Sequence, residues 1–293
     1  MGCFASKNVD SKASRLSRWR ATGIVALRDS KLKILKRRCL SSCHNVIRAR
    51  VMAVPACLVL LQGLKSFPDE VLDLGKSVRT LDLTHNKLVD VPEEISKLMN
   101  MQRLILANNM IGRLPMNIGK LQSLKLIMLD GNQLTTLPDE VGQLVRLERL
   151  SISGNLLTSL PETIGSLRNL LLLNVSHNKL KSLPESVGSC FSLEELQANE
   201  NSIEELPTSV CSLIHLKSLC LDHNNLKQIP PNLLKECKTL QNISLHGNPI
   251  SMDQFQQMEG FKEFEDRRKK KFDKQIDSNV MISSKGLDEG VDL

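Results

Sequence analysis

The sequence predicts an α/β solenoid, a horseshoe of stacked coils with short parallel strands on its concave face and a C-terminal capping helix. Two observations predict this fold. Asparagines recur every 23 residues, with one last interval of 24, and prolines from Pro92 to Pro230 repeat every 23 residues. Such a period marks a repeat architecture, whose units must stack because one unit alone cannot bury its apolar face. The asparagines of this ladder are Asn86, Asn109, Asn132, Asn155, Asn178, Asn201, Asn224 and Asn248.

The frame around each asparagine is L-x-L-x-x-N-x-L-x-x-[LV]-P, as in residues 81–92. The two leucines of L-x-L lie on the same side of a short strand and point into the coil. The asparagine then ends the strand at a turn, where we expect its amide to bond backbone groups of its own coil and of the next coil. Segments such as residues 93–98 return the chain along the convex side, with Ile95 and Leu98 facing inward.

The net charge of +7 is unevenly divided along the chain. Residues 1–65 carry 14 lysines and arginines against Asp10 and Asp29, whereas the remaining 25 cations face 30 acids. We therefore expect the N-terminal arm to seek an anionic membrane surface, and we expect the repeat body to bind no nucleic acid. The apolar run 51–61 is interrupted by Pro55 and is shorter than the about 20 residues that a membrane-spanning helix needs.

The cysteines and the N-terminus indicate a protein inside the cell. The first 20 residues contain no apolar segment typical of a secretory signal. Four of the eight cysteines lie in or beside apolar repeat positions, without the paired clusters of secreted repeat proteins, and we interpret them as reduced thiols, most of them in the core. They are Cys190, Cys211, Cys220 and Cys237.

Residues 1–24 are interpreted as an acylated basic arm. The start Met1-Gly2-Cys3-Phe4-Ala5-Ser6 matches the N-myristoylation pattern, which would place myristate on Gly2 and palmitate on Cys3. Two acyl chains, or one with a basic patch, hold a protein stably on a membrane, here the cytoplasmic face of the plasma membrane or of endomembranes. The alternative is a chance match with an idle thiol. Trp19 either anchors in the membrane interface or packs over the first coil.

Residues 25–33 resemble the first half of a degenerate repeat, with Ser30 in the asparagine position. The second half resumes only at Ser66, so residues 34–65 interrupt the register, and a Leu-Lys dipeptide flanks the break on both sides. Three interpretations stay open: an ordered functional insertion, a disordered loop, or a product of an alternative gene structure. The composition favours the last two.

The array spans residues 66–250, and its outward strand positions form the concave face on which solenoids bind partners. Arginines lie in the first half of this face and acids in the later coils, so we expect a protein partner whose basic patch meets the C-terminal half. For any one residue, the alternative is a solvated side chain without a partner. The candidate partner-binding residues are His85, Arg103, Asp130, Arg149, His177, Glu195, Glu200, Asp222 and His223.

No pattern in the sequence indicates catalysis, a cofactor or a metal. The histidines just before the ladder asparagines lie roughly 20 and 10 Å apart along the strands, too far for a shared metal ion. Cys39, Cys43 and His44 lack the second ligand pair of a structural zinc site. Neither a Ser-His-Asp order nor a glycine-rich phosphate loop occurs in a suitable context. We therefore expect a non-enzymatic protein.

Residues 251–274 are expected to form one capping helix. Phe255, Met258, Phe261 and Phe264 are three residues apart and would share a helix face that covers the end of the core. The five cations 267–271 would then occupy the last helical turn, where the helix dipole favours them. The tail 275–293 is polar and expected to be disordered.

The frame in Leu150–Leu167 resembles the Ras-group class of intracellular leucine-rich repeats, which includes the plant intracellular Ras-group-related proteins. The Met1-Gly2 start and the segment Met258–Phe264 are also similar to the family of leucine-rich repeat-containing protein 57. The resemblance covers residues 1–33 and 66–274. It implies a leucine-rich-repeat horseshoe that acts as a scaffold in intracellular signalling, with partners such as a small GTPase or a kinase. We expect the chain to be monomeric. The alternative is a substrate-targeting or regulatory subunit of a phosphatase or ubiquitin ligase.

Overall fold

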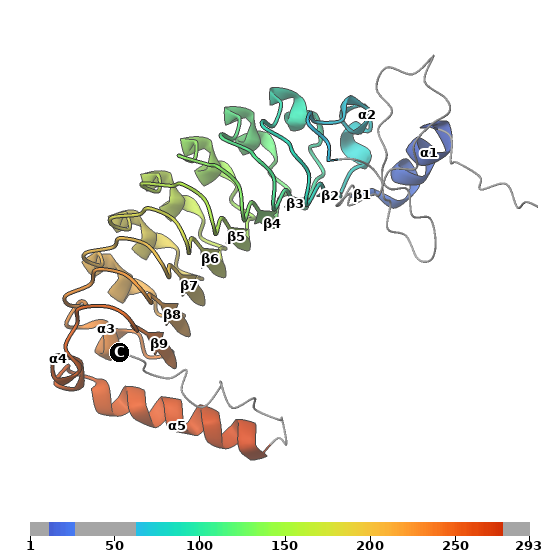
Figure 1. Cartoon of the computed structure of the whole chain (residues 1–293). Helices are drawn as coiled ribbons and strands as arrows, with labels where there is room; N and C mark the ends of the chain where they lie inside the picture. The colour runs from blue at the N-terminus through green and yellow to red at the C-terminus, as the bar shows by residue number, and fades with distance from the viewer. Residues whose placement is uncertain (1–11, 27–62, 278–293) are drawn as a thin grey trace, which may run out of the picture.

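The computed structural model describes residues 12–26 and 63–277 and shows a curved solenoid with its strands on the inner side (Figure 1). The expectations for Gly2, Cys3, residues 27–62 and the tail beyond 277 lie outside the described residues. Nine parallel strands follow one another in sequence order within one sheet. The coil that contains each strand takes the strand's number. The strands are β1 Ile24–Ala26, β2 Thr80–Asp82, β3 Arg103–Ile105, β4 Leu126–Met128, β5 Arg149–Ser151, β6 Leu172–Asn174, β7 Glu195–Gln197, β8 Ser218–Cys220 and β9 Asn242–Ser244.

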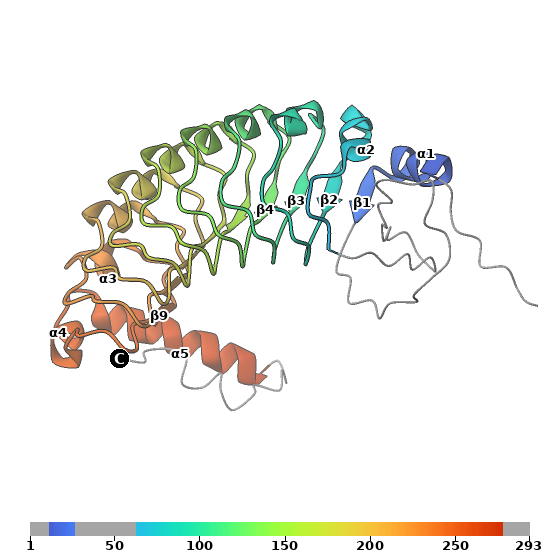
Figure 2. The ribbon, with the colours of Figure 1, turned by 45° about the horizontal axis from the view of Figure 1, so that its top comes forward.

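The outer side of the horseshoe carries short helices, two in the first coil and one in each of coils 2 to 8 (Figure 2). Most of them begin directly after a repeat proline, whose φ near −70° and extended ψ direct the chain into the helix. The proline period in the sequence therefore marks the start of the outer helices. These helices are α2 Asp69–Leu72, η1 Gly75–Ser77, η2 Glu93–Lys97, η3 Met116–Lys120, η4 Asp139–Gln143, η5 Glu162–Ser166, η6 Glu185–Ser189, η7 Thr208–Ser212 and α3 Leu233–Glu236.

One continuous apolar core runs from Trp19 at one end to Phe264 at the other. The inward leucines of the strands lie opposite their equivalents in the next coil, as Leu104 does with Ile127, and both are buried. Stacking thus removes from water an apolar face that a single coil would leave exposed. The solenoid with parallel inner strands, predicted from the repeats, is confirmed.

Glycines set the spacing of the outer helices. A Cβ atom on Gly165 would collide with the backbone and side chain of Ser186 in the next coil, and Gly142 and Gly188 meet their neighbours in the same way. These positions lie in consecutive coils, so the outer helices pack closer there than any side chain would allow.

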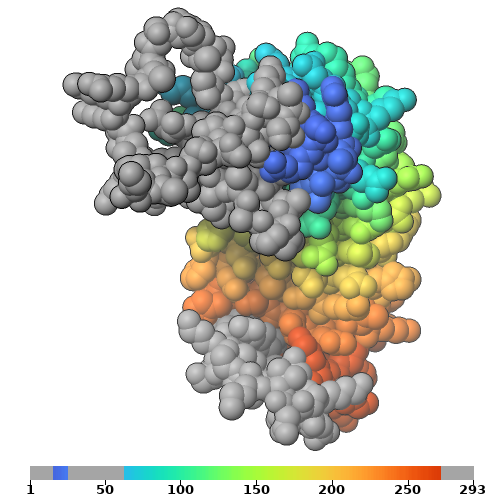
Figure 3. Space-filling view, turned by 90° about the vertical axis from the view of Figure 1, so that its right-hand side faces the viewer, coloured from blue at the N-terminus to red at the C-terminus, as the bar shows by residue number. Residues whose placement is uncertain are grey.

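The N-terminal end is closed by helix α1 Lys12–Thr22 and strand β1. Trp19 is 2% exposed and belongs to the core, so this tryptophan packs against the first coil. Gly23, with φ +66°, ends the helix, and its carbonyl oxygen accepts hydrogen bonds from Arg79 and Thr80 N–H at 2.6 and 3.0 Å. Figure 3 shows α1 lying directly on the first coils.

The first coil is assembled from two segments that are distant in sequence. Strand β1 pairs with β2, with Val25 opposite Leu81. Leu64 N–H donates to Asn86 Oδ1 at 3.0 Å, as Leu88 N–H does to Asn109 Oδ1 one coil later. Coil geometry has therefore resumed by Leu64, two residues before the resumption at Ser66 that the sequence suggested.

The C-terminal cap differs from the prediction of one helix. It consists of α4 Met252–Gln256 and α5 Phe261–Asp277, separated by Gly260 with φ +88°. The position requires glycine, because an added Cβ atom would lie 2.7 Å from the backbone nitrogen of Lys235 and the left-handed φ disfavours other residues. The break lets Phe255 and Phe264 both reach the core, with their ring centroids 6.3 Å apart.

The basic run 267–271 lies in the middle of α5, so its predicted place on the last helical turn is wrong. The helix continues to Asp277 and crosses the end of the last coil (Figure 1). Arg267 Nε donates to Leu240 O at 3.0 Å, and Lys271 Nζ donates to Asn242 Oδ1 at 2.7 Å. These two cations therefore fasten the cap to the array. Among the described residues, no helix combines the length and apolar character that crossing a bilayer requires.

Candidate protein-binding face

The asparagine ladder holds the ends of the strands in place. Asn109 Nδ2 donates to Leu106 O in its own coil and to Leu83 O in the preceding coil, both at 2.9 Å, and Asn109 Oδ1 accepts from Leu88 N–H at 3.1 Å. From Asn132 to Asn248 the other ladder asparagines repeat these bonds. The expectation that the amide serves its own coil is met, but the neighbour it reaches is the preceding coil instead of the next. The reason is that the turn places the amide beside the preceding strand's carbonyl groups.

The residue before each ladder asparagine has a left-handed backbone, and we call these eight positions the turn column. An L side chain in this conformation costs roughly 1–2 kcal/mol, which glycine avoids and which asparagine and histidine tolerate better than most residues. The left-handed backbone thus explains why histidines recur in this column. The φ values are His85 56°, Asn108 56°, Gly131 65°, Gly154 65°, His177 53°, Glu200 51°, His223 53° and Gly247 71°.

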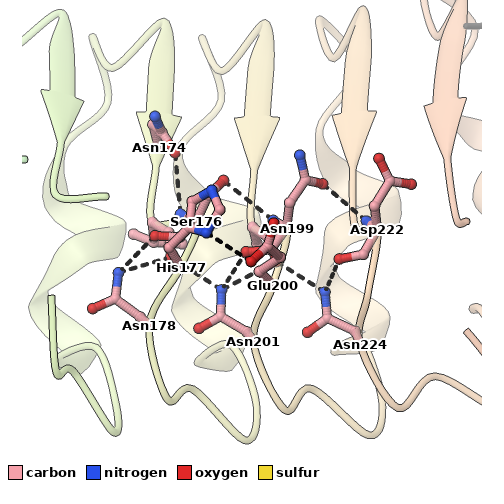
Figure 4. A network of polar contacts seen from close by, with 11 residues as sticks. Asn174, Ser176, His177, Asn178, Asn199, Glu200, Asn201, Asp222 and Asn224 are labelled. Carbon is pink, nitrogen blue, oxygen red and sulfur yellow. Dashed lines mark hydrogen bonds and ion pairs between the residues drawn. The ribbon is translucent and has the colours of Figure 1, made fainter. Parts of the chain in front are cut away.

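Side chains of the turn column lie over the following coil. His177 Nδ1 lies 2.9 Å from Glu200 Oε2, an ion pair when the imidazole is protonated (Figure 4). A Cβ atom on Gly247 would lie 2.5 Å from His223 Nδ1, so the glycine leaves room for that ring. His223 in turn packs edge-on against His246, with ring centroids 5.4 Å apart. The column therefore forms a polar rim along the turns that follow the strands.

Asp130 and Asp222, predicted as partner-binding residues, hold neighbouring coils together. Asp222 Oδ1 accepts from Ser244 Oγ at 2.5 Å and from His246 N–H at 2.8 Å. Asp130 Oδ1 makes the same two bonds one coil onward, to Ser151 Oγ and a backbone N–H. Each carboxylate thus uses one oxygen to fix the next turn. Figure 4 shows how Asn199 and Ser176 extend this pattern of bonds between coils 6 and 8.

The first residues of strands β3 to β7 form a row across the sheet, which we call the inner row. Cα pairing places each member opposite the next. The charged members are exposed and the leucines are half-buried. The charged members were predicted from the sequence but the leucines were not, although the leucines occupy the same repeat position as Arg103. The inner row is Arg103, Leu126, Arg149, Leu172 and Glu195.

The predicted face thus divides into two sets. Arg103, Arg149 and Glu195 share the inner row, whereas His85, His177, Glu200 and His223 share the turn column. Within the described part of the chain, no group of three histidine, cysteine or acidic side chains is placed to hold a metal ion.

Cys190 and Cys237 are buried core residues, whereas Cys211 and Cys220 are half-buried. Burial raises the pKa of the Cys190 thiol to about 11 and that of Cys237 to about 12. Cys190 Sγ donates to Ile164 O at 3.3 Å. A thiol with such a pKa carries almost no thiolate at neutral pH and is a poor nucleophile.

Comparisons with known proteins agree with the repeats. Family profiles for a leucine-rich repeat region, a leucine rich repeat and a further leucine rich repeat match residues 116–199, 191–250 and 77–98. The chain is 69% identical over 293 residues to plant intracellular Ras-group-related LRR protein 7 of Oryza sativa subsp. japonica, covering 100% of both chains. It is 35% identical over 98 residues to protein 8 of the same series and species, covering 33% of this chain and 18% of that protein.

Solved structures of plant receptors share the fold. The peptide hormone receptor RGFR1 in complex with RGF2 matches with a TM-score of 0.57 and 30% identity, over 62% of this chain and 30% of that one. The LRR ectodomain of the Arabidopsis thaliana receptor kinase GASSHO1/SCHENGEN3, in complex with CASPARIAN STRIP INTEGRITY FACTOR 2, matches with a TM-score of 0.57 and 32% identity, over 62% and 23%. This chain therefore spans less than a third of either receptor chain.

Proposed function

This chain belongs to the plant intracellular Ras-group-related leucine-rich-repeat proteins, and on that premise we propose that it is a non-enzymatic scaffold that binds a protein partner on its concave face. The observation that carries the proposal is the inner row, whose charged side chains are exposed on a sheet fixed by the asparagine ladder. A rigid sheet that presents charged and apolar side chains loses little conformational entropy when it binds.

The charges of the face suggest the partner's polarity. Arg103 and Arg149 lie in coils 3 and 5, whereas Glu195 and Glu200 lie in coil 7. A signalling protein such as a small GTPase or a kinase would bind with a basic patch over coil 7, and complementary charge would speed the encounter. Asp130 and Asp222 contribute less, because each already uses one carboxylate oxygen within the array.

Site-specific photo-crosslinking tests the binding face. A photoreactive residue in place of Met128, half-buried on β4, should capture a discrete partner in cells, whereas the same residue in place of Lys120, exposed on the outer helix η3, should not. Capture only from the outer position would reject the concave face. Stoichiometric recovery of a phosphatase or ubiquitin-ligase catalytic subunit from Met128 would assign the chain to a regulatory role instead.

We further propose that acylation of Gly2 and Cys3 holds the protein on the cytoplasmic face of a membrane. Support comes from the Met1-Gly2 motif and from the cations of the arm. Cell fractionation of Gly2→Ala tests it, with Ser11→Ala as the control in the same arm. Loss of membrane association in Gly2→Ala alone is expected, and an unchanged distribution would reject the anchor.

A further inference from the structure

The inner row alternates charged and apolar side chains in a fixed order. From coil 3 to coil 7 it reads cation, leucine, cation, leucine, anion, and consecutive members are paired in register. Ile105 and Met128, half-buried on the same face two residues further along β3 and β4, widen the apolar area around Leu126. A partner that matches this face must present the opposite charges and apolar groups in the same order.

The charged side chains of the inner row differ in their pairing from those one residue earlier in each strand region, which form ion pairs between coils. At that earlier position Lys125 Nζ pairs with Glu148 Oε1 at 2.7 Å, and Lys217 Nζ pairs with Glu194 Oε2 at 2.8 Å. Among the described residues, the ion pairs leave out all three charged members of the inner row. Their charges are therefore not neutralised by a neighbouring described coil and remain available to a partner.

The spacing of the coils selects the conformation of the partner segment. Four strand intervals of about 4.8 Å span roughly 19 Å. On a helix, residues at i, i+4, i+7, i+11 and i+14 share one face and span about 21 Å at 1.5 Å per residue. In an extended segment, five residues on one face are two apart and span about 27 Å. Of the two conformations, only the helix places five contact residues at a spacing that matches the five coils.

We propose that the inner row binds an amphipathic α-helix of a partner protein, lying across strands β3 to β7. The helix presents, on one face, an acid to Arg103, an apolar residue to Leu126, an acid to Arg149, an apolar residue to Leu172 and a cation to Glu195. This inference rests on the proposed concave-face binding and adds the shape and the charge order of the bound segment.

A stapled helical peptide tests the proposal. A labelled peptide of about 18 residues, made helical by a hydrocarbon staple on its far face, carries Glu, Leu, Glu, Leu and Arg at the five facing positions. Two comparison peptides serve as controls. The first has the same composition but exchanges the positions of the first Glu and the Arg. The second keeps the five facing residues and replaces two other residues by prolines, which prevent a helix. Fluorescence anisotropy with the full-length chain should show the matched helix binding at least about tenfold more tightly than either comparison peptide.

A charge exchange localises the binding. Arg149→Glu should weaken the matched peptide about tenfold, and a peptide with Lys in place of its second Glu should bind Arg149→Glu better than it binds the original chain. The matched control is Arg168→Glu, an exposed arginine that follows the outer helix η5, which should change neither affinity.

Equal affinities for the matched and charge-exchanged peptides, no measurable binding of the matched helix, or no compensation by the Lys peptide would each overturn the helix proposal. If crosslinking from position 128 still captures a partner in those cases, concave-face binding is supported and only the proposal of a bound helix is rejected. If neither experiment shows binding, both proposals fall.

Discussion

The Nδ1 atom of His177 lies 2.9 Å from Glu200 Oε2, and both residues hold a left-handed backbone, with φ of 53° and 51°. Histidine tolerates this conformation better than most residues, but glutamate has no such tendency. The backbone therefore gives no reason for a glutamate at position 200, whereas the contact with His177 does. Strain of this kind at an exposed position supports a role in binding.

Replacement of Glu200 tests this strain. Glu200→Gly should raise the free energy of unfolding by up to about 1 kcal/mol, because relief of the left-handed strain exceeds the loss of an exposed pair. Glu200→Val should lower it by about 1 kcal/mol, since a β-branched side chain is worse there. Urea unfolding followed by circular dichroism measures both. The control Glu204→Gly lies outside the left-handed positions and should not stabilise; a gain there equal to that of Glu200→Gly would refute the strain argument.

Asn132 tests the ladder. Asn132→Ala should lower the free energy of unfolding by about 1–3 kcal/mol, because it leaves Ile111 N–H buried without its partner and leaves Leu106 O with the bond from Asn109 alone. Asn225→Ala, at an exposed asparagine of the eighth coil, should change it by less than about 0.5 kcal/mol. Similar losses for the two variants in urea unfolding would contradict the structural role of the ladder.

Two glycines with different surroundings can be compared, Gly165 on the outer helix η5 and Gly112 in the segment before η3. Gly165→Ala should destabilise the array by about 1–3 kcal/mol, because the new methyl group meets Ser186 in the next coil. Gly112→Ala meets nothing within 4 Å and should be neutral or slightly stabilising. Thermal unfolding compares them, and a loss in Gly112→Ala as large as that in Gly165→Ala would show that packing is not the cause.

The buried thiols predict a pH dependence. Burial raises the folded-state pKa of Cys190 and Cys237 from 9.0 to about 11 and about 12, so the folded chain binds these protons more tightly than the unfolded chain does. Their contribution to stability is therefore complete below pH 9 and is lost as the pH rises from 9 towards 12. Cys190→Ala/Cys237→Ala should show a smaller loss of melting temperature over that range than the original chain. Equal losses would exclude the thiols as the cause.

The cap depends on Arg267. Arg267→Ala should lower the free energy of unfolding by about 1–3 kcal/mol, because Leu240 O and Leu234 O lose a charged donor. Lys269→Ala, on the exposed side of the same helix, is the control and should be nearly neutral. Hydrogen exchange should rise around β9 in Arg267→Ala alone; protection equal to that of the control would argue against this role.

The repeat period predicted the solenoid because every coil meets the same packing requirement. Local features that depend on one neighbour were harder to predict. The spacing of three in the series Phe255, Met258, Phe261 and Phe264 fits one continuous helix, but Gly260 has a left-handed φ of +88° and separates two helices. The close approach of the Lys235 backbone to Gly260 is a tertiary feature that the spacing does not reveal. Equally, Leu32 and Leu64 fit the same repeat position in the sequence, and only the bond to Asn86 identifies Leu64 as its occupant.

The candidate face was predicted in part. Arg103, Arg149 and Glu195 were found because charge in an outward strand position is conspicuous, whereas Leu126 and Leu172 look like core residues in a leucine-rich sequence. The roles of Asp130 and Asp222 could not be predicted, because their bonds join coils whose relative position only the fold defines.

Each ladder amide bonds the coil that precedes it in the sequence, so the coils become fully hydrogen-bonded in the order in which they are synthesised. On a ribosome, a newly emerged coil stays incomplete until its successor appears and closes its open carbonyl and amide groups. Shortened versions of the chain should therefore lose different ladder bonds: a cut that removes late coils takes away the asparagine that bonds the coil left behind, whereas a cut that removes early coils leaves the first remaining asparagine without its partners in the preceding coil.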